Sequence, residues 1–363
     1  MVNDWSAVVP PIFLTAGFEE RDDTSPAAAF TYSRYGNPTV DALERALAER
    51  EEAEASVVFS SGMGAIHAVL AGLLGRSAVA VVSDHVYPGT EVLVRYLHDR
   101  GWLTVRFVDP DDLDAVRRAL HGARLLWLEA PSNPGLHVPR IDDLVQAARH
   151  ADVLVAVDAT MATPVYWKPV DDGVDLVVHS LTKYVSGGGD VLGGVVAGRA
   201  DLVDEVRTVA AATMGNVLSA FNAFLLSRGL ASLAVRVPAQ STTAAGVADW
   251  LASRLGNDRV WYPLHPHAPR RSEHAPFGAV VLFGLDNAAC FERRLSESTL
   301  LRRAPSFGDT QTLISCLCPA RFPPASRGAL RRRCGTVDGL YRLAVGLDQM
   351  TAVTAELERL LAQ

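Results

Sequence analysis

The stretch DLVVHSLTKYVSGGGD, residues 175–190, carries the pattern that decides the fold. A short aliphatic run ends abruptly in hydroxyl-bearing side chains and a lysine. Such runs recur along the first half of the chain, and segments with helical periodicity separate them. The alternation predicts an α/β fold with a mostly parallel sheet and helices on both faces. The predicted strands are 56–59, 78–83, 103–108, 124–129, 152–157, 175–178 and 193–198.

The chain is predicted to contain an arm and two domains. Residues 1–40 form the N-terminal arm, 41–240 the large domain and 241–363 a smaller α+β domain. The boundary rests on VPAQ at 237–240, which breaks a long helical stretch and is interpreted as a hinge. Strands at 280–285 and 341–347 are expected in the smaller domain.

Composition excludes several classes of protein. A net charge of −7 over 363 residues argues against nucleic acid as the main partner. We expect no membrane span or signal peptide, and we interpret the basic run at 327–334 as a solvated helix face. No cysteine or histidine spacing, including that of the loop at 265–276, predicts a metal site. Buried free thiols and a cytoplasmic location are expected from the four cysteines, Cys290, Cys316, Cys318 and Cys334.

Lysine usage singles out one residue. The chain has two lysines and 32 arginines. Lys168 lies in a predicted loop, where a surface charge is the simplest interpretation. Arginine cannot serve as a nucleophilic amine at ordinary pH, so a site that forms an imine has to keep lysine. Lys183 is therefore the candidate nucleophile.

Polar and small residues gather where the predicted strands end. Gly62 and Met63 open a helix whose free N–H groups suit an anion. Asp158 ends an apolar strand, where a carboxylate needs a partner such as a cationic ring nitrogen. Taken singly, each feature also fits an ordinary turn, cap or structural side chain. Further candidates at these ends are the ring of Tyr87, which could stack on a planar group, and the hydroxyls of Ser180 and Thr182.

Together these residues describe a site for pyridoxal phosphate (PLP), held as a Schiff base on Lys183. The glycine-rich run at 187–194 does not have the G-x-G-x-x-G spacing, and it comes too late in the chain for a dinucleotide site. A nicotinamide-dependent oxidoreductase is therefore disfavoured.

Several motifs resemble those of the cystathionine γ-synthase/γ-lyase family, the Cys/Met-metabolism enzymes of PLP fold type I. The resemblance spans nearly the whole chain, and its motifs occur in the same order as in the family. They are YSRYGNPT at 32–39, SSGMGAI at 60–66, EAPSNP at 129–134, VDATMATP at 157–164, HSLTKY at 179–184, RGLASLAVR at 228–236 and YRLAVGL at 341–347.

The resemblance implies a role for each matching residue. Lys183 would bind the cofactor and carry protons, Asp158 would hold its ring nitrogen protonated, and Tyr87 would stack on its ring. Asn133 would bond the phenolic oxygen of the cofactor. Arg342 would bind the substrate α-carboxylate beside Ser306. The phosphate would be held by Gly62, Met63, Ser180 and Thr182, and by Tyr32 and Arg34 of a neighbouring subunit. A homodimer, paired into a homotetramer, is therefore expected.

The departures from the family lie on the substrate side. Gly187–Asp190 contains no histidine, where relatives often have one. Gly89 stands where methionine γ-lyases carry cysteine, and Pro305 stands where cystathionine enzymes often place a polar residue. We therefore expect γ-elimination or γ-replacement on an unusual γ-substituted L-amino acid in specialised metabolism. The alternatives are chloride elimination giving a terminal-alkyne amino acid, a β-lyase acting on a cystathionine- or cysteine-like substrate, and a catalytically silent PLP-fold binding subunit.

Overall fold

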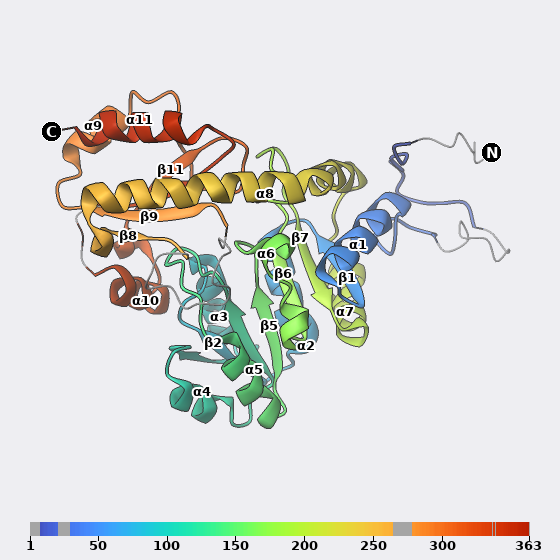
Figure 1. Cartoon of the computed structure of the whole chain (residues 1–363). Helices are drawn as coiled ribbons and strands as arrows, with labels where there is room; N and C mark the ends of the chain where they lie inside the picture. Colours follow the sequence, from blue (N-terminus) through green and yellow to red (C-terminus); the bar gives the residue numbers. More distant parts are fainter. Residues whose placement is uncertain (1–7, 21–29, 264–277, 336, 338, 363) are drawn as a thin grey trace.

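A computed structural model describes residues 8–20, 30–263, 278–335, 337 and 339–362. Two sheets, each flanked by helices, make up most of it, and the long helix α8 (Ala220–Leu255) runs beside both (Figure 1). The described residues ahead of α1, 8–20 and 30–37, extend away from the body of the chain. The α/β fold predicted from the alternating pattern is confirmed.

The large sheet has seven strands in the order β1-β7-β6-β5-β4-β2-β3, and only β7 runs against the others. Its strands are β1 (Ala55–Phe59), β2 (Val79–Ser83), β3 (Thr104–Val108), β4 (Leu125–Glu129), β5 (Leu154–Asp158), β6 (Leu176–Ser180) and β7 (Gly194–Gly198). The flanking helices are α1 (Pro38–Glu51), α2 (Gly62–Leu73), α3 (Pro88–Asp99), α4 (Leu113–Leu120), α5 (Ile141–His150), α6 (Thr163–Tyr166) and α7 (Ala200–Val206), with the 3₁₀ helix η2 (Pro169–Asp172) and the π-helix η3 (Arg207–Thr213).

The central strands β4, β5 and β6 are apolar except for their last one or two residues, because helices cover both faces of the sheet. In β6, Val178 packs into the hydrophobic cluster that contains α2, while its neighbour Val177 packs into the cluster that contains α5. Successive side chains of a strand point to opposite faces, so a strand covered on both sides needs no polar alternation. The first polar residues therefore appear where the strands end.

A second sheet of five strands follows, in the order β10-β11-β12-β9-β8. Its strands are β8 (Val260–Trp261), β9 (Val280–Leu285), β10 (Arg302–Arg303), β11 (Leu313–Leu317) and β12 (Gly339–Ala344). The accompanying helices are α9 (Ala289–Leu295), α10 (Pro324–Cys334) and α11 (Met350–Leu361), with the turns η4 (Asn257–Arg259) and η5 (Pro319–Arg321). The strand predicted at 280–285 is confirmed, whereas the strand predicted at 341–347 begins and ends earlier.

Helix α8 continues through 237–240, so the predicted hinge is wrong. An internal proline costs a helix about 3 kcal/mol. Here Val237, just before Pro238, is fully buried, and apolar residues on both sides of the proline pack into one core cluster. This packing holds the helix straight across the proline. The domain boundary at 240 stays a prediction.

Helix α8 also has the length and mean hydropathy, 1.2, of a membrane-spanning helix. Its buried positions include Arg236 and Gln240, which bond to backbone carbonyls of other segments. Length and composition are weak grounds for a membrane span when a helix forms part of a folded core in this way.

Three smaller predictions, on the cysteines, on Lys168 and on the loop at 265–276, have different outcomes. Cys334 is buried as expected, but Cys290, Cys316 and Cys318 are exposed, so the buried-thiol interpretation is wrong for these three. Cys316 lies near the end of β11 and Cys318 directly follows it, beyond the two residues that pair with β10. Lys168 forms an exposed ion pair with Glu52, in keeping with a surface charge. The loop at 265–276 lies outside the described residues.

Candidate active site

The parallel strands β1, β2, β4, β5 and β6 end at one edge of the large sheet, and a cavity of about 220 Å³ opens there. Ligands of open α/β sheets bind at this edge. The wall of the cavity contains nine of the predicted site residues, namely Gly62, Met63, Tyr87, Asn133, Asp158, Ser180, Thr182, Lys183 and Arg342.

Lys183 follows the end of β6, and its amine reaches across to the smaller sheet. Its Nζ donates to Ser306 Oγ at 3.1 Å and lies 4.9 Å from the centre of the Phe307 ring. Burial and the nearby charge of Arg342 lower the pKa of Lys183, while the carboxylate of Asp309 acts in the opposite direction. A lowered pKa leaves more of the amine unprotonated, as a nucleophile or base requires.

Asp158 ends β5 with a buried carboxylate. Its Oδ1 accepts from the backbone N–H of Thr160 at 3.0 Å and from the Thr160 hydroxyl at 2.5 Å. Burial raises the pKa of Asp158, and these hydrogen bonds and the charge of His179 work against the rise. A cationic ring nitrogen in the cavity would further favour the ionised carboxylate.

The beginning of α2 provides a cradle for an anion. Ser61 caps the helix by accepting from Gly64 N–H at 3.0 Å. A Cβ atom on Gly62 would meet the Cβ of Ser180 at 2.7 Å, so only glycine lets β6 and the helix approach this closely. The Thr182 hydroxyl bonds to both backbone groups of Gly193, so an anion would have to share it.

Glu129 is a site residue to which the sequence analysis assigned no role. It ends β4, and Oε2 accepts from Tyr87 N–H while Oε1 accepts from Asn133 N–H, each at 2.6 Å. Burial, and then the neighbouring charge of Asp158, raise the pKa of Glu129. The sequence did offer a signal for Glu129, because it ends an apolar strand with a carboxylate. The same pattern identified Asp158 as a candidate. Glu129 therefore holds the backbone of Tyr87 and the backbone of Asn133 in place together.

Arg342 lies on β12 and enters the cavity from the smaller sheet. It is only 6% exposed, and its guanidinium donates to Asn133 Oδ1 at 3.0 Å and to the Ser306 carbonyl at 3.2 Å. Its Nε–H is buried and has no acceptor among the described residues. Burial lowers the pKa of Arg342 to about 10, which leaves it cationic at neutral pH. An unfilled donor on a buried cation suits a carboxylate ligand.

Tyr32 and Arg34 lie outside this cavity. Tyr32 is 44% exposed, and Arg34 donates to the Ala212 carbonyl and to the Tyr35 hydroxyl. Their predicted contact is with the cofactor of a neighbouring subunit, so their separation from the site of their own chain is the arrangement that this role needs. The role itself stays a prediction.

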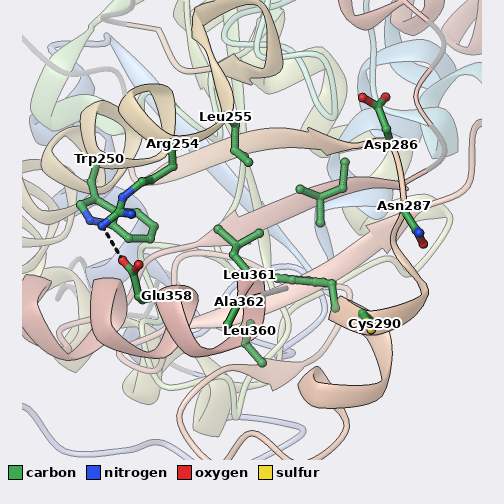
Figure 2. Close-up of a pocket in the computed structure, with 12 residues that line it drawn as sticks. Trp250, Arg254, Leu255, Asp286, Asn287, Cys290, Glu358, Leu360, Leu361 and Ala362 are labelled. Atoms are coloured by element: carbon green, nitrogen blue, oxygen red, sulfur yellow. Dashed lines mark ion pairs between the residues drawn. The ribbon is translucent and has the colours of Figure 1, made fainter.

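A larger cavity, of about 570 Å³, lies in the C-terminal part of the chain (Figure 2). Its charged side chains are largely engaged with each other, since Arg254 pairs with Glu358 at 2.8 Å and Asp286 pairs with Arg259. Leucines and aromatic rings form much of the remaining wall. None of the predicted site residues lines it, so we place the chemistry in the smaller cavity.

With this geometry established, comparison with known proteins identifies the family. The family described as Cys/Met metabolism PLP-dependent enzyme matches residues 2–362. The chain belongs to this family. It is 36% identical to an L-methionine γ-lyase of Fusobacterium nucleatum subsp. polymorphum, covering 92% of this chain and 86% of the relative. It is also 36% identical to an O-succinylhomoserine sulfhydrylase of Pseudomonas aeruginosa, covering 97% and 90%.

The same family appears among solved structures. A cystathionine γ-synthase of Xanthomonas oryzae pv. oryzae, crystallised with aminoacrylate and cysteine, superimposes with a TM-score of 0.89 at 32% identity. That comparison covers 99% of this chain and 94% of the other. The chain is therefore a PLP-dependent enzyme of fold type I, as the motifs led us to expect.

The residues of the small cavity fit the cofactor. Asp158 offers a buried carboxylate, α2 offers free N–H groups, and Lys183 offers an amine whose pKa is lowered. Residues that would hold PLP are Gly62, Met63, Tyr87, Asn133, Asp158, Ser180, Thr182 and Lys183. Bound there, PLP supplies a sink for the electrons released when a proton leaves the substrate.

Proposed function

We propose that the enzyme catalyses elimination or replacement at the γ-carbon of a γ-substituted L-amino acid with a small, uncharged substituent. The observation that carries the amino-acid part is the buried, unfilled Nε–H of Arg342 in the same cavity as Lys183. A substrate carboxylate held there brings its α-carbon to the Lys183 amine. The names of the related γ-lyases and sulfhydrylase support chemistry at the γ-carbon.

The substituent is inferred from the remaining wall of the cavity. Among the described residues lining it, the charged side chains are Glu129, Asp158, Lys183 and Arg342, and each has a partner or a role toward the cofactor or carboxylate. The rest of the wall includes a largely apolar set, Ile66, Pro131, Met161, Leu192, Pro305 and Phe307. Within the described part of the chain, such a wall offers a charged distal group no free counter-charge. An apolar thioether or a halide fits it better than the amino and carboxyl groups at the far end of cystathionine.

The residues of the chain divide the chemistry between them. Arg342 holds the carboxylate. The Lys183 amine would accept the α-proton of the bound substrate and then move protons at its β-carbon. The Ser306 hydroxyl, 3.1 Å from Nζ, orients the amine during these transfers. Departure of the γ-substituent completes an elimination, and entry of a nucleophile in its place completes a replacement.

The first test uses the two lysines as a matched pair. Wild-type protein is expected to show a visible absorption band, and borohydride should fix the cofactor on Lys183. Lys183→Ala should abolish both the fixation and turnover, whereas Lys168→Ala should change neither because Lys168 pairs with Glu52 on the surface. Near-normal turnover in Lys183→Ala would refute its role. A wild-type protein that stays colourless with added PLP would favour the silent binding subunit.

The second test identifies the substrate class. A panel of methionine, cystathionine, O-acyl homoserines and a γ-chlorinated unsaturated amino acid is scored for keto acid, ammonia and released substituent. We expect turnover of the uncharged members and little of cystathionine. Release of chloride with the amino group retained would identify the terminal-alkyne product, for which the small apolar cavity leaves room. Exclusive breakdown of cysteine-type substrates would favour the β-lyase alternative.

We also propose that the enzyme works in the cytoplasm as a homodimer, paired into a homotetramer. The support is the exposure of Tyr32, the position of Arg34 outside the cavity and the free state of the four cysteines. Light scattering gives the size. Mixing Lys183→Ala with Arg34→Ala subunits tests the shared site, because only hybrid dimers would regain activity.

A further inference from the structure

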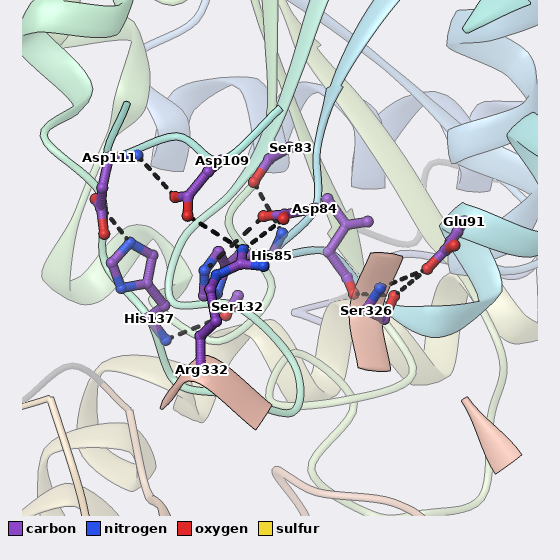
Figure 3. Close-up of polar contacts among 11 residues, drawn as sticks. Ser83, Asp84, His85, Glu91, Asp109, Asp111, Ser132, His137, Ser326 and Arg332 are labelled. Carbon is purple, nitrogen blue, oxygen red and sulfur yellow. Dashed lines mark hydrogen bonds and ion pairs between the residues drawn. The ribbon is translucent and has the colours of Figure 1, made fainter. Parts of the chain in front are cut away.

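Glu91 makes an unusual contact between the two sheet domains. It lies on α3, which begins directly after Tyr87, and it is 0% exposed. Its carboxylate accepts from the backbone N–H and the hydroxyl of Ser326 at 2.6 Å each (Figure 3). It also accepts from the backbone N–H of Ala325 at 2.8 Å. Ala325 and Ser326 stand in the first turn of α10.

This contact supplies the hydrogen-bond acceptors that the sequence around the start of α10 does not provide. The first N–H groups of a helix have no acceptor within the helix, and their end of the helix dipole is positive. The residue before α10 is Pro323, which provides no side-chain cap. Glu91 therefore caps α10 from another domain, with an ionised group where a neutral serine or asparagine usually suffices.

The far end of α10 is also tied to the segment that carries Tyr87. Arg332, in the last turn, forms ion pairs with Asp84 and, at 3.2 Å, with Asp109. Arg332 is exposed, as expected from the interpretation of the run at 327–334 as a solvated helix face, and its guanidinium is engaged in these two ion pairs. Asp84, His85 and Asp109 place candidate metal-ligand atoms within 4.8 Å of one another, but the guanidinium already supplies the positive charge.

The two ends of α10 connect opposite walls of the active site. Tyr87 stands between Asp84 and Glu91 in the chain. Helix α10 ends at Cys334 and leads into β12, which carries Arg342. A movement of α10 relative to α3 would therefore change the separation between the stacking ring and the guanidinium that receives the substrate.

We propose that Glu91 is a positioning residue that couples Tyr87 to Arg342 by capping α10. The inference rests on the proposed function of this cavity, and it assigns Glu91 no contact with substrate or cofactor. The capping contact holds the carboxylate-binding guanidinium at the distance that an amino acid bound over the cofactor requires. Loss of the cap loosens substrate binding more than it slows the chemical step.

The test is Glu91→Gln in the PLP-loaded enzyme. Glutamine has one acceptor oxygen and no charge, so at least one charge-assisted hydrogen bond to α10 is lost. We expect KM to rise about tenfold, corresponding to one such bond, with a smaller change in kcat. The circular dichroism of the bound cofactor should also change, because the Tyr87 ring shifts. Titration with the non-reacting amino acid glycine, followed through the cofactor spectrum, should give a matching rise in Kd.

Arg95→Gln is the matched control. Arg95 donates to the same carboxylate at 2.7 Å but belongs to α3, so its loss leaves the contact with α10 in place. We expect a near-normal Kd for glycine in this variant. Ser326→Ala removes one donor from the other side and should raise the Kd about threefold. Combined with Glu91→Gln it should add little, since both changes remove the same contact.

Two outcomes separate failure of this inference from failure of the proposed function. If Glu91→Gln lowers the melting temperature but leaves the Kd, KM and cofactor dichroism unchanged, the contact only stabilises the fold and the inference is overturned. If the wild-type enzyme shows no spectral response to any amino acid, the proposed function fails instead. Should Glu91→Gln not fold, the Ser326→Ala comparison decides, because an unaltered Kd there overturns the coupling.

Discussion

Replacement of Arg342 by lysine tests the carboxylate site most directly. The guanidinium makes two bonds, to Asn133 Oδ1 and to the Ser306 carbonyl, and keeps a third buried donor unfilled. Lysine keeps the charge but presents three donors from one point and cannot reproduce the planar fork. Loss of one charge-assisted hydrogen bond costs about 1.5–3 kcal/mol. At 1.36 kcal/mol per factor of ten, kcat/KM should fall about 10-fold to about 150-fold.

Steady-state kinetics on the best substrate of the panel measures this loss, and cofactor loading provides the internal control. Arg342→Lys should load PLP normally, because the positive charge near Lys183 remains. Arg342→Met removes that charge as well, and since the cation contributes to the lowered pKa of Lys183, the pKa should rise. The pH at which the apoenzyme takes up PLP should then move upward in the methionine variant only. Retention of kcat/KM within threefold in Arg342→Lys would refute the assignment.

Two further predictions follow from buried charges. The carboxylate of Asp309 raises the pKa of Lys183, so Asp309→Asn should lower that pKa. The pH midpoint of PLP uptake by the apoenzyme should then move downward. An upward shift would contradict this prediction. Glu51 and His179 form a buried ion pair with Nε2 and Oε1 2.6 Å apart. Burial lowers the pKa of His179, but Glu51 outweighs burial and raises it overall, so the stabilisation is complete below the unfolded pKa near 6.5 and is lost as pH rises through the folded value. Glu51→Gln should therefore cost about 3 kcal/mol of unfolding free energy near pH 6 and less at high pH, as urea denaturation would measure, and a cost that grows with pH would contradict the assignment.

The sequence alone was sufficient to predict those strands and site residues that a local pattern of residues specifies. β6 begins with three apolar residues and ends in His179 and Ser180, and this pattern predicted both the strand and the position of Lys183 after it. Asp158 was recognisable for the same reason. Parallel strands bring such ends together whatever the rest of the chain does, so the composition of the cavity followed from the order of the strands.

Features that depend on contacts between distant segments were not predictable. The predicted hinge at Pro238 was wrong because apolar residues on both sides of the proline pack into one core. Local helix propensity contains no information on such packing. Glu91 reads as an ordinary helix-surface carboxylate until α10, more than 230 residues later, is placed against it. Cys290 on α9, and Cys316 and Cys318 at the end of β11, are exposed, and the hydrophobicity of cysteine carries no information on how these segments pack.

The pairing of β4 with β5 places two buried acids, Glu129 and Asp158, side by side, and their hydrogen bonds explain why they serve different roles. Glu129 and Asp158 are in register on neighbouring strands, and their like charges disfavour simultaneous ionisation. Both oxygens of Glu129 are occupied by backbone N–H groups, whereas the bonds that Asp158 accepts from Thr160 both go to Oδ1. Glu129 is thereby committed to holding the backbone of Tyr87 and Asn133, and Asp158 keeps an oxygen for a partner in the cavity. A cationic ring nitrogen at that oxygen would relieve the repulsion between the two acids, so binding of the cofactor and ionisation of the pair favour each other.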